Sequence, residues 1–421
     1  MAGSEGWDWQ IDKHCVADLT TIQSQFKRVD ELTVSADGER IAAPVRLEDD
    51  SFTACVNGEA WPDSFELLWH LKFAPGGQLI ALVRIDDEWT MVVDGRPWEC
   101  RFQYLWSPKF SGDGRSFAAL YKLDDAFGVT INGGTWQSGF HSIRDYCLSP
   151  NGTHAAATVQ VAPLREADVD GFFEGVWSVA VDGNPWADTF INTWSPAFSW
   201  DGKSVAAEIR SDICEYSIAV DGASWSDRFG CVWAPTFRPK THQVVAPVRQ
   251  HGLWTLAEDG SGFWERRYNM AWGQKFSPDG EHLAAVVSPE FGRWTIAVDD
   301  VPWGVDFGDM VVEPVFSSDS AHVATIAKDE GHWTIVVDGN VWDEDFEMVW
   351  DPIFSPDGQH VLAKAERRGR YVVVADGKAQ QQSFDGLWSP TFSPDGSRVM
   401  LRYVQEGRYY RHVVPTSDLL R

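Results

Sequence analysis

The sequence predicts an all-β fold built from ten four-stranded repeats of about 39 residues. Two turn motifs recur along the 421 residues at a nearly constant spacing, and aromatic residues stand at fixed distances from both turns. The segments between the turns alternate apolar and polar residues with a period of two, which is typical of half-buried strands. No segment shows the 3.6-residue period of a long helix.

The first turn has the form Ser-Pro-Asp-Gly and predicts the link between the first two strands of each repeat. Its central residues are 37 to 40 residues apart, except for one interval of 50 in the fourth repeat. Asp and Asn in such turns bond to their own backbone, and Gly accepts the left-handed conformation. The ten central residues are Asp37, Gly76, Asp113, Asn151, Asp201, Lys240, Asp279, Asp319, Asp357 and Asp395.

The second turn is usually Val-Asp-Gly and predicts the link between the third and fourth strands, because Asp-Gly and Asn-Gly suit tight hairpins. A Trp follows this turn by four residues in seven of the nine copies. An aromatic residue precedes it by five positions in every copy. These residues are Phe52, Trp89, Phe127, Trp177, Tyr216, Trp254, Trp294, Trp333 and Tyr371.

Tryptophan is the outlier of the composition, with 23 residues, or about four times ordinary usage. Repeats of this length with four strands are typical of β-propeller blades. Large flat side chains fill the wedge-shaped gaps between twisted sheets that pack around an axis. We therefore expect the Trp seven residues before the first turn to lie between blades. These are Trp69, Trp106, Trp194, Trp233, Trp272, Trp350 and Trp388.

The two ends of the sequence predict how the propeller closes. The tenth repeat has only three strands, near 387–393, 397–404 and 409–414. Phe26 precedes Asp37, the centre of the first turn of the first repeat, by eleven residues. In seven repeats a fourth-strand Phe stands at the same distance before the first turn of the next repeat. We therefore expect a closing strand near residues 22–30, after an N-terminal extension over residues 1–20, because closure removes an exposed sheet edge. One ring over residues 1–421, as a single domain, is preferred to two five-bladed rings because no linker separates any two repeats.

The charge balance restricts the partners. Lys and Arg number 35 and Asp and Glu 62, which gives a net charge of −27. Nucleic acids and anionic membranes require a basic surface, so neither is expected as a direct partner. No apolar run is long enough to span a bilayer, and the start lacks an export signal. We expect a cytoplasmic protein, monomeric in isolation, that can attach to the inner face of the membrane only through its partners.

The cysteines and other reactive residues give no signature of catalysis or cofactor binding. Six cysteines form no metal-binding spacing, and no nucleophile elbow, zinc motif or phosphate loop is present. We expect no catalytic, metal or cofactor site, and the cysteines are expected to act as small apolar residues. The alternative is a propeller hydrolase or lyase with converging carboxylates or His at its central channel. The six cysteines are Cys15, Cys55, Cys100, Cys147, Cys214 and Cys231.

The interval of 50 residues reveals an acidic insertion at residues 165–175, between the second and third strands of the fourth repeat. A solvated hairpin loop is one interpretation. The other is a contact arm, because acidic residues around adjacent Phe anchors suit docking on a basic partner. The candidate interaction residues are Glu166, Asp168, Asp170, Phe172, Phe173 and Glu174.

The segment Ser-Pro-Asp-Gly-Glu-His-Leu-Ala-Ala (277–285) resembles the WD-repeat-like propeller repeat of the TolB type, and this resemblance covers about residues 26–414. Exported TolB-type proteins carry a signal peptide and a further domain, which this chain lacks. Its Trp loading and its Val-Asp-Gly-x-x-x-Trp element look more like the tryptophan-rich accessory subunit of the transmembrane redox complexes (Tmc type) of sulfate-reducing bacteria. That resemblance implies a cofactor-free subunit on the cytoplasmic side, beside iron–sulfur and membrane partners.

Together these observations predict a non-catalytic propeller scaffold that binds other protein subunits of a membrane-associated electron-transfer complex. Its stability would come from aromatic burial between blades, and its function from what docks on its faces and loops.

Overall fold

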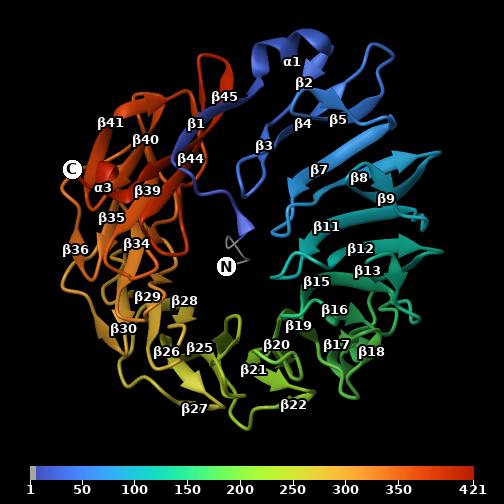
Figure 1. Cartoon of the computed structure of the whole chain (residues 1–421). Helices are drawn as coiled ribbons and strands as arrows, with labels where there is room; N and C mark the ends of the chain where they lie inside the picture. The colour runs from blue at the N-terminus through green and yellow to red at the C-terminus, as the bar shows by residue number, and fades with distance from the viewer. Residues whose placement is uncertain (1–5) are drawn as a thin grey trace. The chain divides into compact units, whose positions relative to one another are not determined.

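The computed structural model describes residues 6–421, and these form ten antiparallel sheets with the strand order of propeller blades (Figure 1). The predicted fold class is confirmed, because each sheet holds the strands expected from one repeat. In five of the sheets the first strand is interrupted and appears as two short strands that both pair with the second. One closed ring, and its alternative of two five-bladed rings, stay predictions.

The chain divides into two compact units, and a single domain over residues 1–421 likewise stays a prediction. One unit is Leu19–Ala246, and the other is Pro247–Arg421 together with the N-terminal segment up to Asp18. The division falls within one strand, β25.

The first three blades lie in the first unit, and each runs through its strands in chain order from the first strand to the fourth. Their elements are β2 (Arg28–Val29), β3 (Thr33–Val34), β4 (Ile41–Arg46), β5 (Phe52–Val56) and β6 (Glu59–Ala60); β7 (Leu67–Phe73), β8 (Leu79–Ile85), β9 (Glu88–Val93) and β10 (Arg96–Pro97); and β11 (Tyr104–Phe110), β12 (Phe117–Leu123), β13 (Ala126–Ile131) and β14 (Gly134–Thr135).

The next three blades follow the same order, and the fourth also carries the helix α2. Their elements are β15 (Ser142–Leu148), β16 (Ala155–Gln160), α2 (Val169–Glu174), β17 (Trp177–Val181) and β18 (Asn184–Pro185); β19 (Asn192–Phe198), β20 (Val205–Asp212), β21 (Glu215–Val220) and β22 (Ala223–Ser224); and β23 (Cys231–Val232), β24 (Thr236–Phe237), β25 (Val244–Gln250), β26 (Leu253–Glu258) and β27 (Ser261–Gly262).

The seventh to ninth blades lie in the second unit. Their elements are β28 (Met270–Phe276), β29 (Leu283–Ser288), β30 (Thr295–Val298) and β31 (Val301–Pro302); β32 (Met310–Val311), β33 (Val315–Phe316), β34 (Val323–Asp329), β35 (His332–Val337) and β36 (Asn340–Val341); and β37 (Met348–Val349), β38 (Ile353–Phe354), β39 (Val361–Arg367), β40 (Arg370–Ala375) and β41 (Lys378–Phe384).

The tenth blade combines both ends of the chain. It contains β42 (Gly386–Leu387), β43 (Thr391–Phe392), β44 (Arg398–Gln405) and β45 (Arg408–Pro415), and its outer strand is β1 (Asp12–Asp18). Two short helices flank these ends, α1 (Leu19–Gln25) after β1 and α3 (Thr416–Leu419) after β45.

Apolar clusters lie between consecutive sheets within each unit and are built mostly from their second and third strands, with residues of first strands added. One cluster joins Leu82 and Met91 of the second blade to Leu105 and Ala119 of the third. Most residues of the second and third strands are almost completely buried. These strands therefore read as continuous apolar runs, as is typical of strands buried on both faces.

The Trp that follows the second turn packs on the corresponding turn of the next blade. A Cβ built on Gly95 would lie 3.4 Å from the Trp61 ring, and one on Gly339 would lie 3.3 Å from Trp303. Both glycines have positive φ, +78° and +77°. Glycine therefore satisfies two requirements at once, the turn conformation and the close approach of an indole. The same contact occurs at Gly133, Gly183, Gly222 and Gly377.

Hydrogen bonds within the repeat fix both turns, as the Ser–Asp spacing predicts. In the seventh blade the Ser277 hydroxyl accepts from the His282 amide at 2.9 Å and donates to Asp279. The Asp299 carboxylate of the second turn accepts from the Leu283 amide at 2.9 Å, which joins the two turns across the blade. Donors from Ser277 and from the backbone hold the pKa of Asp279 below its usual value.

The strand that completes the tenth sheet lies earlier in the chain than the predicted closing strand. β1 pairs with β45 over Asp12–Asp18, so residues 12–18 and not 22–30 complete the tenth sheet. Phe26 follows α1 instead. The backbone beyond it is already paired with β4, since Lys27 donates to the carbonyl of Arg46 at 3.0 Å, and these groups are therefore unavailable to β45.

The insertion of the fourth blade also differs from the predicted loop. Within residues 165–175, the segment Val169–Glu174 forms α2, and the Asp168 carboxylate accepts from the Gly171 amide at 2.9 Å. Asp168 is thus the N-cap of this helix, because a side-chain acceptor at this place satisfies an amide that has no partner in the first turn.

We predict that Gly339→Ala lowers the unfolding free energy by about 2 kcal/mol, because the added methyl meets both the positive φ and the Trp303 ring. The matched control is Gly331→Ala, whose φ is +85° and whose Cβ would meet nothing within 4 Å. Its expected cost is about 1 kcal/mol, from the backbone alone. Equal losses for the two variants in denaturant titrations would contradict the proposed Trp–Gly contact.

We predict that removal of residues 1–18 produces a chain that melts at a lower temperature and aggregates. The deletion exposes the edge of β45, and it removes the backbone carbonyl of Asp8 that accepts from the buried guanidinium of Arg411. Thermal melts and light scattering measure both effects. A monomeric variant with an unchanged melting temperature would show that β1 is dispensable.

Candidate interaction surface

Four blades place a His beside the Asp of the second turn. The Nδ1–Oδ2 distances are between 2.5 and 2.8 Å. Asp299 raises the pKa of its partner His282, because the hydrogen bond favours the charged imidazole. The same Asp residues also accept strand amides through Oδ1, so each pair belongs to the turn architecture of its blade. The pairs are His154–Asp182, His282–Asp299, His322–Asp338 and His360–Asp376.

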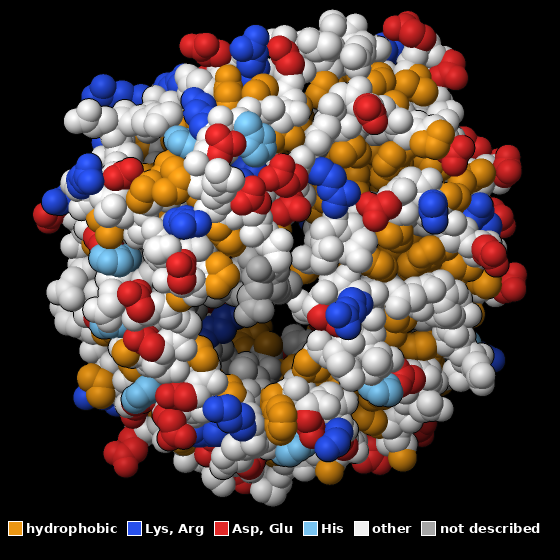
Figure 2. All heavy atoms as spheres, viewed as in Figure 1, with side chains coloured by type: hydrophobic (Ala, Val, Ile, Leu, Met, Phe, Trp, Pro, Cys, Tyr) orange, Lys and Arg blue, Asp and Glu red, His pale blue; other side chains and the backbone are white. Residues whose placement is uncertain are grey.

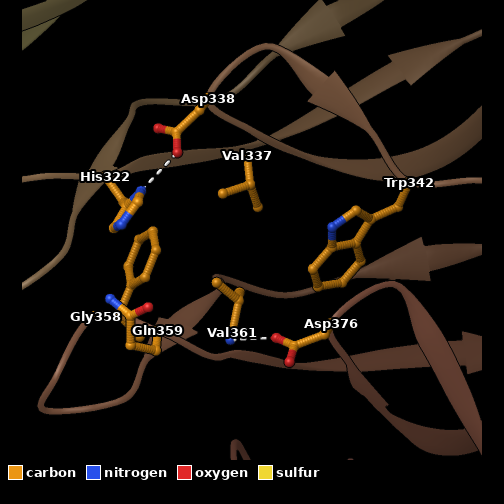
Figure 3. A pocket seen from close by; sticks show the side chains of 9 residues that line it. His322, Val337, Asp338, Trp342, Gly358, Gln359, Val361 and Asp376 are labelled. Atoms are coloured by element: carbon orange, nitrogen blue, oxygen red, sulfur yellow. Dashed lines mark hydrogen bonds and ion pairs between the residues drawn. The ribbon is translucent and has the colours of Figure 1, made fainter.

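A pocket of about 240 Å³ lies between the eighth and ninth blades, next to one of these pairs. In Figure 3 the His322 ring points to the Asp338 carboxylate, and the Trp342 indole lies on the other side of the space. Asp376 is engaged by the Val361 amide at 2.8 Å. The nine lining residues include no hydroxyl, thiol or amine side chain that His322 could activate. The pocket is therefore best explained as a gap at a blade interface, with its polar groups committed to the turns.

Six of the seven Trp residues of the first strands contact an aromatic ring of their own blade. Trp69 contacts Trp89 with a centroid distance of 4.5 Å, and Trp350 contacts Tyr371 at 5.7 Å. Each partner is the aromatic residue that precedes the second turn by five positions. The equivalent pairs are Trp106–Phe127, Trp194–Tyr216, Trp272–Trp294 and Trp388–Tyr409.

The predicted burial between blades is wrong for two of these Trp. Trp69 is 42% exposed, and Trp233 is similarly exposed. The Trp that follow the second turn also lie between blades, against the turn of the next blade. Position along the strand alone does not decide exposure, because Trp106 and Trp272 hold the same strand position and pack against apolar clusters that join two blades.

A continuous row of five rings crosses the second and third blades, and we call it the aromatic ladder. It consists of Trp69, Trp89, Tyr104, Trp106 and Phe127, with successive centroid distances between 4.5 and 6.1 Å. Trp69 and Tyr104 are 42% and 43% exposed. Figure 2 shows hydrophobic side chains grouped over the region that β8, β9, β11 and β12 occupy in Figure 1, with acidic side chains beside them.

Two acidic hairpin turns flank the aromatic ladder. Asp86 and Asp87 link β8 to β9, and Asp124 and Asp125 link β12 to β13. All four have positive φ, between 47° and 67°. Gly adopts this conformation without strain, and among other residues Asn and Asp adopt it most often. The sequence analysis missed both the ladder and these turns, although the Asp-Asp pairs between two strand patterns were visible.

The predicted contact arm projects from the fourth blade, and we use this name for residues 165–175. Helix α2 has no buried residue, Val169 is 60% exposed and Phe173 is 44% exposed. Phe172 meets Phe173 edge to face at 5.4 Å. Glu166, Asp170 and Glu174 are exposed, whereas Asp168 is used as the N-cap. The structure thus brings together all six predicted residues on one short segment.

The second strand of the fifth blade, β20, carries a buried acid. Glu208 is 8% exposed, directly across from Trp194 in the sheet. Burial raises its pKa to about 7, the Ser195 hydroxyl opposes this shift, and the negative charge of Asp145 adds to it. Aliphatic residues, Leu82 and Leu120, occupy the matching position in two other blades. Glu208 is therefore an uncharged, buried acid below about pH 7.

The potential ligands for metals are dispersed. Within residues 6–421, no group of three or more His, Cys, Asp or Glu side chains is placed to hold a metal ion. The six cysteines are free thiols, and burial raises the pKa of Cys147 to about 12. In the same range, no helix is long and apolar enough to cross a bilayer.

Comparisons with known proteins give structural similarity only. No family model matches the sequence, and no curated protein does. Solved structures similar to this chain include a eukaryotic initiation factor, with 12% identity over 79% of this chain and 93% of that chain and a TM-score of 0.46. The Dos1 propeller has 10% identity over 73% and 92% of the two chains, with a TM-score of 0.39. TolB from Acinetobacter baumannii has 15% identity over 57% and 60%, with a TM-score of 0.29.

We predict that Glu208→Gln removes a pH-dependent loss of stability. In the unfolded chain this acid ionises near its ordinary value of 4.5, whereas in the folded chain it stays protonated to about pH 7. The wild-type chain therefore loses stability as the pH rises from about 4.5 to 7, by at most about 3 kcal/mol. The variant should be more stable than the wild type at pH 8 and similar to it at pH 4. If the stabilities of the variant and the wild type differ by the same amount at every pH, Glu208 does not have this role.

Proposed function

We propose that this protein is a non-catalytic interaction scaffold that docks a positively charged protein partner. The contact arm carries this proposal. Its helix contributes nothing to the core, yet it is capped at its start and holds Val169 and Phe173 in solvent. Exposed apolar side chains with an acidic surround suit the centre and rim of a protein interface.

The negative charge of this chain favours a positively charged partner. The chain carries a net charge of −27, and three carboxylates of the contact arm are exposed around the two Phe rings. The hairpins of the neighbouring blades add exposed apolar residues, Leu123 and Ile213, next to Asp124 and Asp212. Such a field attracts a basic protein and accelerates encounter, while the apolar residues supply the short-range contact.

The finer proposal is that the partners are subunits of a membrane-associated electron-transfer complex. In it this chain would carry no redox cofactor and would lie on the cytoplasmic side. Its support is the sequence resemblance to the tryptophan-rich accessory subunit of Tmc-type complexes, through the Val-Asp-Gly-x-x-x-Trp element. The test is affinity purification from source membranes in mild detergent, with identification of what copurifies. Haem or iron–sulfur subunits in fixed ratio support the proposal, and recovery of the chain alone contradicts it.

We predict that replacement of residues 162–175 by Asn-Gly abolishes capture of the partner and leaves the melting temperature within about 2 °C. Val161 and Val176 are already paired across the hairpin, so a two-residue turn can close it. The measurement is affinity capture alongside a thermal melt of the same preparation. Undiminished capture by the shortened chain would remove the contact arm from the interface.

The charge contribution is tested separately by the triple variant Glu166→Gln, Asp170→Asn and Glu174→Gln. It keeps both Phe rings and the Asp168 N-cap, so the arm retains its shape. Binding should weaken several-fold, and its dependence on salt should become shallower. An unchanged dependence on salt would show that the attraction comes from elsewhere on the surface.

A further inference from the structure

Two blades place a cation against aromatic rings of their own, one from the second strand and one from the first. In the ninth blade Lys364 on the second strand lies over both rings of the aromatic pair. Its Nζ is 3.8 Å from the centroid of Trp350 and 4.4 Å from that of Tyr371. In the fourth blade Arg144 replaces the first-strand Trp, and its guanidinium carbon lies 3.7 Å from the Trp177 ring. These geometries are favourable cation–π contacts.

The second blade has the same aromatic pair without a cation of its own. Leu82 stands directly across from Trp69, at the position that Lys364 has in the ninth blade. The nearest basic residue on this strand, Arg84, is held by Glu66 at 3.3 Å and by Asp87. Among residues 6–421, no Lys or Arg of this chain makes a cation–π contact with Trp69, Trp89 or Tyr104. Trp69, the exposed ring of the pair, is therefore accessible to a cation from outside, whereas Trp89 is buried.

The acidic turns next to the ladder carry carboxylates at a conformational cost. Asp87 and Asp125 have left-handed φ values of 67° and 63°. The matching turns of the last three blades have Gly331, Gly369 and Gly407 there, which adopt positive φ without strain. Each Asp side chain is more than four-fifths exposed, and its ion pair with Arg84 or Lys122 is a surface pair of small net energy. An incoming cation therefore loses little by displacing such a pair.

We propose that the aromatic ladder binds arginine or lysine side chains of a partner protein. A guanidinium or ammonium group lies over Trp69 and Tyr104, and Asp87 and Asp125 neutralise it from the two turns. Exposed rings give the contact its short-range attraction, and the carboxylates select a cation over a neutral aromatic or sugar ligand. This inference deepens the proposed scaffold function and rests on it for the identity of the ligand as a protein.

The first experiment titrates the full chain with a tetra-arginine peptide and with the tetra-citrulline peptide, which keeps the shape but not the charge. We expect saturable binding of tetra-arginine alone. The variant Trp69→Ala with Tyr104→Ala should bind it about tenfold more weakly, through the loss of two cation–π contacts. The control variant Trp233→Ala removes an exposed Trp of another blade and should bind normally. Equal affinities for the two variants would overturn the proposal.

A second variant separates binding from stability. Asp87→Gly with Asp125→Gly removes the two carboxylates but supplies the residue that the turn conformation favours, so its melting temperature should stay the same or rise. Its affinity for tetra-arginine should fall several-fold. The charge control is Glu281→Gln with Asp343→Asn, two exposed acids remote in sequence. Equal weakening by both double variants would reduce the effect to net charge and overturn the assigned site.

Affinity capture distinguishes this inference from the scaffold function itself. If the wild-type chain and the ladder variants capture the same partner equally well, the scaffold function stands and the ladder site is wrong. If the wild-type chain captures nothing, the scaffold function is wrong, and the peptide titration still decides whether the ladder binds cations.

Discussion

The contact between a tryptophan and the glycine of the next blade's turn is the constraint on which the rest of the structure depends. It sets how closely consecutive sheets approach, because a Cβ on Gly95 or Gly339 would already touch the indole. The hydroxyl of the third strand stabilises the segment that carries the Trp, as when Thr90 donates to the carbonyl of Cys100 at 2.9 Å. Each blade therefore presents a fixed indole ring, and the turn of the next blade packs against it.

Many polar side chains form hydrogen bonds that stabilise the repeated turns, and those that do not are candidates for function. The Ser–Asp bonds and the His–Asp pairs recur from blade to blade, so the fold explains them. The aromatic ladder, the Asp-Asp turns beside it and the contact arm lie in blades two to four, near where second strands turn into third strands. Asp-Asp turns as such are not confined to these blades, since Asp299 and Asp300 of the seventh blade also have positive φ. Departure from a repeat without structural benefit is a useful indication of function.

The sequence analysis was correct where the interactions join residues close in sequence, and it was wrong where they join residues far apart. Turns such as Ser277-Pro278-Asp279-Gly280 are closed by groups a few residues apart, so their positions were predictable. The closing strand was misplaced because Phe26 matched the spacing of other repeats, while the pairing of residues 27–30 with β4 depends on distant backbone groups. Helix α2 was missed because six residues carry too weak a periodic signal.

By itself, the sequence determined the number of blades, the turns between their strands, the acidity of the surface and the candidate residues of the contact arm. These follow from local conformational preference and from a pattern repeated ten times. Only the tertiary structure decided which Trp lie between blades and which remain in solvent, that β1 completes the last sheet, and that five rings form one ladder. Burial and ring contacts depend on how neighbouring sheets twist and pack, and one strand's sequence does not contain that information.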